Sequence, residues 1–172
     1  MTIICGTNRP ESNTSKVLEY CVKTAENQGF DVDVLDLQKL PSTFLSEGIY
    51  GDPSDSFSQI LEKKIVPASH IMFVVPEYNG SYPGILKLFL DTTLPKLWAG
   101  KKAALIGLAT GRSGNQRGLD HLTAVLHYLK MEVYSQKPLL SSIHQHLNEE
   151  GNMSNREYQG LIESQIKGFK AF

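Results

Sequence analysis

Two unbroken apolar runs place the strongest constraint on how this chain can fold. They lie at residues 71–75 and 103–108, and neither alternates between apolar and polar side chains. A strand with one face in water alternates in this way, whereas a strand buried on both faces is apolar throughout. The two runs therefore predict central strands of a parallel sheet that helices cover on both faces.

Shorter strand-like runs at residues 3–5, 32–37 and 132–134 bring the number of strand candidates to five. Apolar residues recur at helical spacing between and after these runs. The helical segments lie at residues 17–25, 57–65, 85–89, 119–129 and 158–169. Alternating strands and helices with right-handed crossovers predict one doubly wound α/β domain over residues 1–172, built on a five-stranded parallel sheet.

Composition excludes several classes of function. The chain has 172 residues, the usual size of a single domain, with 17 basic residues against 18 acidic ones. A nearly neutral chain has no surplus positive charge with which to hold nucleic acid or anionic lipid. No run approaches the ~18 apolar residues of a membrane span, and the first strand-like run leaves no room for a signal peptide. We therefore expect a cytoplasmic protein.

Cysteines and histidines indicate neither a disulfide nor a metal centre. Cys5 lies in an apolar run and Cys21 on a helical face, so both are expected to be small buried hydrophobic residues. The five histidines include one close-spaced pair, His144 and His146, with no cysteine nearby to complete a site. We expect no bound metal.

The first candidate binding segment, residues 6–15, follows the first strand and is rich in hydroxyl groups. Ligands of doubly wound sheets bind beyond the carboxyl ends of the strands, and a helix start there offers unpaired N–H groups and the positive end of a dipole. The guanidinium of Arg9 can meet a phosphate with two hydrogen bonds. The alternative is that a hydroxyl or amide here only caps the helix. The expected phosphate-binding residues are Thr7, Arg9, Ser12, Asn13 and Thr14.

The second segment, residues 75–87, follows the third strand and reads Val-Pro-Glu-Tyr-Asn-Gly-Ser-Tyr-Pro-Gly-Ile-Leu-Lys. Asn79 and Gly80 allow a tight turn with positive φ, and Tyr78 can lie against a flat ring. Taken alone, the same residues fit a surface turn with half-buried aromatics at its rim. The string closely resembles the flavin-edge loop of the NAD(P)H-dependent FMN reductase family, a flavodoxin-like group that includes quinone, azo and chromate reductases.

That resemblance implies a flavodoxin-like fold with flavin mononucleotide (FMN) at the carboxyl end of the sheet. The residues that it places at the flavin edge are Pro76, Glu77, Tyr78, Asn79 and Gly80.

The third segment, residues 109–118, also resembles the family, whose corresponding turn passes under the pyrimidine end of the flavin. Its glycines leave backbone N–H groups accessible, and Arg112 can offset negative charge near N1 and O2 of the reduced ring. The alternative is a flexible loop with solvated arginines. The glycines do not have the G-x-G-x-x-G spacing of a dinucleotide fingerprint. The residues expected at the flavin are Thr110, Gly111, Arg112 and Gly114.

The family resemblance implies an oxidoreductase that takes hydride from NADPH or NADH and passes electrons to a flavin, a quinone, an azo or nitro compound, or a metal oxyanion. No side chain is expected to be catalytic, because the flavin N5 atom carries the chemistry. Two alternatives are a flavodoxin-like electron carrier, which the near-neutral charge and Arg9 disfavour, and a binding module that has lost its flavin.

The resemblance also implies a homodimer or homotetramer in which a neighbour's loop covers the flavin. The irregular stretch between Gln38 and Pro53, with Phe44 and Tyr50, is the candidate for that loop.

Overall fold

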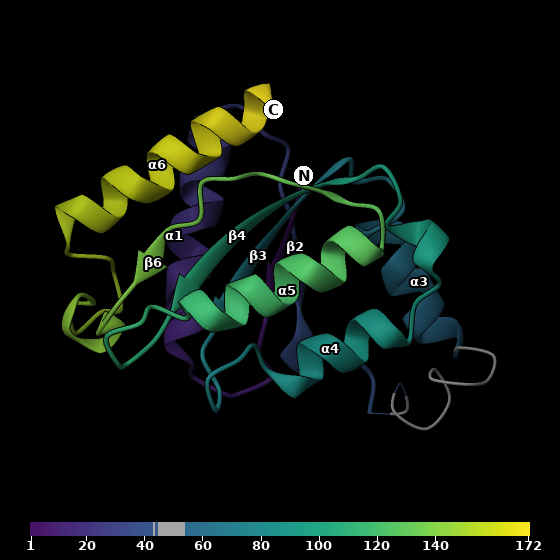
Figure 1. Ribbon diagram of the computed structural model, residues 1–172, viewed down its shortest axis with the longest axis horizontal. Coiled ribbons are helices and arrows are strands. Elements are labelled where there is room, and N and C mark those ends of the chain that lie inside the picture. Colours follow the sequence, from purple (N-terminus) through teal and green to yellow (C-terminus); the bar gives the residue numbers. More distant parts are fainter. Residues whose placement is uncertain (43, 45–53) are drawn as a thin grey trace.

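The computed structural model describes residues 1–42, 44 and 54–172. Its centre is a parallel sheet (Figure 1), in which the strand order is β2-β1-β3-β4-β5. The strands are β1 (Thr2–Cys5), β2 (Asp33–Asp36), β3 (His70–Pro76), β4 (Lys102–Leu108) and β5 (Glu132–Val133). The chain runs outward from β1 to β2 and then in the opposite direction through β3, so the strand order reverses between β1 and β3. Ligands of doubly wound sheets bind at this reversal.

Two very short strands share the fifth position of the sheet. β5 pairs with the start of β4, whereas β6 (Leu139–Leu140) pairs with its end. Between them, the buried side chain of Gln165 donates hydrogen bonds of 2.8 Å to the carbonyl oxygens of Leu105 and Gln136. β5 lies within the predicted strand at residues 132–134. β6 was not predicted, because a strand of two residues is too short to show a periodic pattern.

Helices cover both faces of the sheet, as predicted (Figure 1). α1 (Asn13–Asn27) and α6 (Arg156–Ala171) pack on one face, and α3 (Asp55–Lys64), α4 (Gly84–Asp91) and α5 (Gln116–Tyr128) pack on the other. Short 3-10 helices occur at Leu37–Lys39, Pro95–Leu97 and Ile143–Gln145. β3 serves both cores, because Met72 and Val74 join the α1/α6 cluster while Phe73 and Val75 join the other.

Some element ends differ from the prediction. The predicted strand at residues 32–37 stops at Asp36, because the Asp36 carboxylate accepts the N–H of Gln38 and begins a 3-10 turn. The helix predicted at residues 119–129 ends at Tyr128, and Leu129 is its C-cap.

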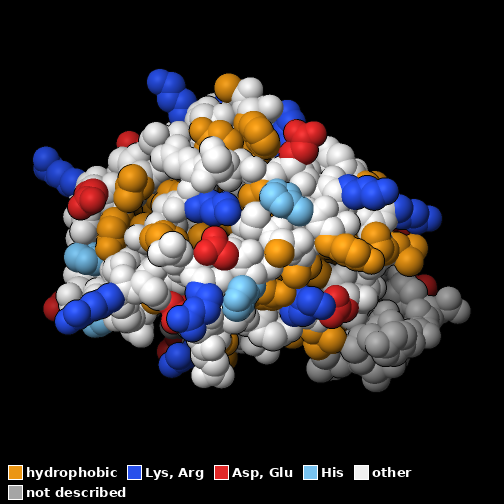
Figure 2. All heavy atoms as spheres, viewed as in Figure 1, with side chains coloured by type: hydrophobic (Ala, Val, Ile, Leu, Met, Phe, Trp, Pro, Cys, Tyr) orange, Lys and Arg blue, Asp and Glu red, His pale blue; other side chains and the backbone are white. Residues whose placement is uncertain are grey.

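The two cysteines are buried, as predicted, and the visible surface carries charges of both signs. On the face shown in Figure 2, acidic and basic side chains are interspersed with hydrophobic ones, and no broad patch of a single charge is visible. Cys5 and Cys21 are both buried and both are thiols. In the part of the chain that the structure describes, no helix has the length and apolar content needed to cross a membrane.

Candidate functional site

The three predicted segments meet at the carboxyl edge of the sheet. Loop A (residues 6–12) joins β1 to α1, loop B (residues 77–83) joins β3 to α4, and loop C (residues 109–115) joins β4 to α5. Together with the start of α1 they surround a hollow of about 440 Å³. This volume is within the range of small-molecule sites, and the hollow lies where the strand order reverses.

Eight of the predicted site residues line this hollow, and they come from all three segments. They are Arg9, Ser12, Asn13, Thr14, Pro76, Glu77, Tyr78 and Thr110.

Six other predicted residues lie in the same loops without lining the hollow: Thr7, Asn79, Gly80, Gly111, Arg112 and Gly114. Thr7 is buried beneath the loops, and Gly114 is packed tightly. A Cβ atom on Gly114 would lie 2.8 Å from the backbone of Leu139, and its φ is +58°. The tight packing explains why Gly114 is a glycine.

Five lining residues were not predicted: Pro10, Glu11, Leu108, Ala109 and Ile143. Leu108 and Ala109 stand at the carboxyl end of β4, so the rule that ligands bind beyond strand ends could have identified them. Ile143 has no such signal. It reaches the hollow because its N–H donates to the carbonyl of Ala109 at 3.0 Å, a contact between distant parts of the chain.

The start of α1 is suited to an anion. The Ser12 hydroxyl accepts the N–H of Ser15 at 3.2 Å, so this side chain caps α1 as well as lining the hollow. Within the described residues, the N–H groups of Asn13 and Thr14 have no hydrogen-bond acceptor. They lie at the positive end of the helix dipole and line the hollow beside Arg9. This end of the hollow can hold a phosphate.

Loop B forms the tight turn that the sequence predicted. Tyr78 and Ser81 exchange backbone hydrogen bonds of 2.9 and 3.1 Å. Asn79 and Gly80 between them have φ values of +52° and +73°, as in a type I′ turn. The turn rests on α5, since a Cβ atom on Gly118 would lie 2.7 Å from the carbonyl carbon of Ser81. Tyr78 is thereby held at the wall of the hollow.

Loop C is tied to β3 and to loop B by side chains. Asn115 is fully buried with a φ of +71°, and its Nδ2 donates to the carbonyl oxygen of Val75 at 2.9 Å. The Ser113 hydroxyl donates to the carboxylate of Glu77. Glu77 therefore has a partner in loop C, and this contact is consistent with a role in holding the loops together.

Several arginines lie at this edge, where the lining of the hollow also includes the carboxylates of Glu11 and Glu77. The chain contains four arginines, and Arg9, Arg112 and Arg117 belong to loop A, loop C and the first turn of α5. In the described part of the chain, none of the three is within ion-pair distance of a carboxylate. These guanidinium groups are therefore available to meet an anionic group of a ligand.

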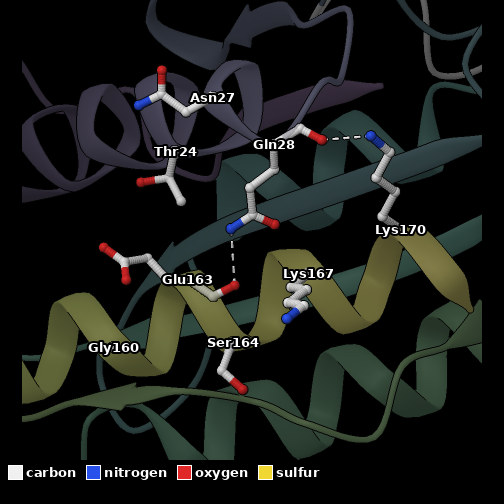
Figure 3. Close-up of a pocket in the computed structure, with 8 residues that line it drawn as sticks. All are labelled: Thr24, Asn27, Gln28, Gly160, Glu163, Ser164, Lys167 and Lys170. Carbon is white, nitrogen blue, oxygen red and sulfur yellow. Dashed lines mark hydrogen bonds between the residues drawn. The ribbon is translucent and has the colours of Figure 1, made fainter.

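A larger hollow, of about 770 Å³, lies elsewhere, between the C-terminal half of α1 and α6 (Figure 3). Its walls are joined by their own hydrogen bonds, because Gln28 donates to the carbonyl of Glu163 at 3.0 Å and accepts at its carbonyl from Lys170. None of the three loops contributes to its lining. The hollow at the carboxyl edge is therefore the candidate site.

The residues at that edge fit FMN. The unpaired N–H groups and Arg9 suit its phosphate, and the half-buried aromatic side chain of Tyr78 can lie against a flat ring.

Comparisons with known proteins agree with this reading. A 2-hydroxy-1,4-benzoquinone reductase of Burkholderia sp is 25% identical over 177 residues, covering 100% of this chain and 94% of that protein. An NAD(P)H-dependent FMN reductase of Saccharomyces cerevisiae is 31% identical over 150 residues, covering 76% of this chain and 75% of that protein. Among solved structures, the apo form of an NADH:FMN oxidoreductase has a TM-score of 0.78 at 22% identity, covering 99% of this chain and 87% of that one.

The family model for NADPH-dependent FMN reductases matches residues 1–145, a span that includes all three loops. The chain therefore belongs to the NADPH-dependent FMN reductase family.

Proposed function

We propose that this protein binds FMN in the hollow between loops A, B and C, and that it oxidises NADPH or NADH and reduces a quinone, an azo or nitro compound, or free flavin. The observation that carries the proposal is that one hollow is lined both by the start of α1, with its unpaired N–H groups, and by the Tyr78 turn. A phosphate and a flat ring could be held there together.

The chain's own residues would bind and orient the cofactor. Arg9 and the N–H groups of Asn13 and Thr14 would hold the phosphate, since charge-assisted hydrogen bonds to a phosphate are strong. Tyr78 and Thr110 would border the ring, and the accessible N–H groups of loop C would meet its polar edge. FMN, when bound, supplies the atom that accepts a hydride. No side chain needs to transfer a proton in the proposed role.

The acceptor class is proposed from the relatives. The names of the Burkholderia protein and of an NAD(P)H:quinone oxidoreductase of Solanum tuberosum specify quinones, and that of a Staphylococcus saprophyticus protein specifies an azoreductase. We propose that this protein uses the same classes of electron acceptor.

We also propose that residues 1–172 form one cytoplasmic FMN-binding domain that assembles as a homodimer or homotetramer. Most of the stretch between Gln38 and Pro53, including Tyr50, lies outside the described residues, so its role as a cover for a neighbour's flavin stays a prediction. Phe44 is described and is buried in the core of its own chain, 5.8 Å from Phe57 between ring centroids. Light scattering after gel filtration tests the assembly.

Absorption spectroscopy and turnover test the proposed function together. Protein loaded with FMN is expected to retain the yellow flavin bands after gel filtration, and to oxidise NADPH or NADH continuously when a benzoquinone or an azo dye is present. Protein that binds FMN without oxidising either nucleotide would be an electron carrier. Protein that does not retain FMN would contradict the proposal entirely.

A further inference from the structure

One partly buried hydrogen bond joins the two ends of the candidate site. The hydroxyl oxygen of Thr7 lies 2.7 Å from the phenolic oxygen of Tyr78. Thr7 is only 1% exposed, and Tyr78 is half-buried. Within the described residues it is the one side-chain hydrogen bond between loop A and loop B. Any communication between these loops through side-chain hydrogen bonds therefore passes through Thr7.

Thr7 also holds the backbone of the phosphate end. Its hydroxyl oxygen accepts the N–H of Arg9 at 3.2 Å. The preceding residue, Gly6, donates its N–H to the carbonyl of Val74 at 2.9 Å, and a Cβ atom there would lie 2.9 Å from the same oxygen. Loop A is thus fixed to the end of β3 at Gly6, and Thr7 connects Arg9 on one side to Tyr78 on the other.

These contacts assign Thr7 a role different from a direct phosphate contact. We propose that Thr7 is a positioning residue that couples the phosphate end of the site to the ring end through its hydrogen bond to Tyr78. An anion at Arg9 and the start of α1 orders loop A, and the ordered Thr7 hydroxyl holds the Tyr78 phenol in place. Binding of the flavin ring then requires less further ordering of loops A and B. By thermodynamic linkage, ring binding raises the affinity for the anion by the same factor.

This inference rests on the proposed function and can be tested by presenting the two halves of FMN separately. Riboflavin carries the ring and no phosphate, and inorganic phosphate can occupy the phosphate end while riboflavin is bound. Riboflavin affinity is measured by fluorescence titration with and without phosphate, at an ionic strength matched with chloride. In the unaltered protein, saturating phosphate is expected to tighten riboflavin binding about three- to tenfold, the net contribution of one intramolecular hydrogen bond.

Two variants remove the bond from opposite sides, and one preserves it. Thr7→Val keeps the shape of Thr7 without its hydroxyl, and Tyr78→Phe keeps the ring without its phenol. Both are expected to bind riboflavin with no enhancement by phosphate, and the double variant is expected to behave as either single one. Thr7→Ser, which retains the hydroxyl, is expected to retain the enhancement. A general loss of packing would not be rescued in this way.

The possible results separate this inference from the proposed function. Phosphate enhancement that persists in both Thr7→Val and Tyr78→Phe would overturn the positioning role, as would an unaltered protein that binds FMN and riboflavin without any response to phosphate. An unaltered protein that binds neither FMN nor riboflavin would overturn the proposed function itself, and this inference with it.

Discussion

Asn115 and Val75 form the hydrogen bond that fixes loop C to the end of the central strand β3. The bond spans 2.9 Å from Nδ2 of Asn115 to the carbonyl oxygen of Val75, and Asn115 is fully buried. Asparagine also suits the φ of +71° at this position better than most residues do. Asn115 therefore both adopts the positive φ that loop C requires and attaches the loop to β3.

Asn115→Ala is therefore expected to lower the free energy of unfolding by about 2–4 kcal/mol, because the Val75 carbonyl loses its side-chain partner and alanine is strained at positive φ. Urea denaturation measures this change. Asn27→Ala, at an exposed position in α1, is the matched control and should stay within about 0.5 kcal/mol. Equal denaturation midpoints for both variants would show that the buried bond contributes little.

Arg9→Gln is expected to weaken FMN binding about 10- to 100-fold, because a guanidinium hydrogen-bonded to phosphate contributes about 1.5–3 kcal/mol. Riboflavin affinity measured without phosphate should not change, since riboflavin lacks the group that Arg9 meets. Arg156→Gln, which removes an exposed arginine at the start of α6, should leave both affinities unchanged. Fluorescence titration of the two flavins distinguishes the cases, and a parallel loss of both would argue against Arg9 as a phosphate contact.

Arg117 is expected to contribute to the choice between NADPH and NADH. Its Nη1 atom is 2.9 Å from the position of a Cβ on Gly80, so the guanidinium lies beside the loop B turn. It is exposed, and in the described structure no carboxylate pairs with it. Arg117→Gln should raise the KM for NADPH about tenfold with kcat nearly constant, because a contact to the additional phosphate is lost.

The KM for NADH should change much less in Arg117→Gln, and Lys167→Gln on α6 should alter neither value. If the KM rises equally for both nucleotides, Arg117 contacts a group that they share.

Substitution by alanine should change the stability of the protein in opposite directions at Gly118 and at Gly160. A Cβ atom on Gly118 would lie 2.0 Å from Oδ1 of Asn115 and 2.7 Å from the carbonyl carbon of Ser81. Gly118→Ala should therefore displace the loop B turn, destabilise the fold by about 1–3 kcal/mol and weaken FMN binding. Nothing lies within 4 Å of a Cβ on Gly160 in α6. Gly160→Ala should stabilise the protein by about 0.5–1 kcal/mol, and thermal unfolding compares the two.

The cysteines are expected to be unreactive in the folded protein. Burial raises the pKa of Cys5 to about 11, with a smaller contribution from Asp36, and burial raises the pKa of Cys21 to about 12. Both thiols are therefore protonated at about pH 8, and the thiolate is the reactive form. Reaction with a thiol reagent should be slow in the native protein and rapid in denaturant; rapid native reaction would show that a thiol is accessible.

These raised pKa values also set the sign of a pH effect on stability. A thiol whose pKa is higher in the folded state favours folding while it is protonated. The contribution is complete below the unfolded pKa and is lost as the pH rises through the folded value. Stability should therefore decrease progressively above about pH 9, and denaturation midpoints measured across this range test the effect.

Local patterns determined most of the architecture. Residues 71–75 and 103–108 could be assigned to central strands because burial on both faces removes alternation. The loop B turn could be assigned because only a few residue types adopt positive φ at low cost, and Asn79–Gly80 is such a pair. In both cases the physical preference belongs to the residues themselves or to their neighbours in the chain, so the sequence alone was sufficient.

Tertiary structure decided how the polar groups of the site are used. No local pattern distinguishes the buried Thr7 from a hydroxyl that faces the hollow. Its hydrogen-bond partner, Tyr78, is 71 positions away in the sequence. The same is true of Ile143, which enters the hollow through a backbone contact with Ala109. A hydrogen bond forms only where the folded chain brings donor and acceptor within about 3 Å. The spacing of two residues in the sequence does not predict this distance.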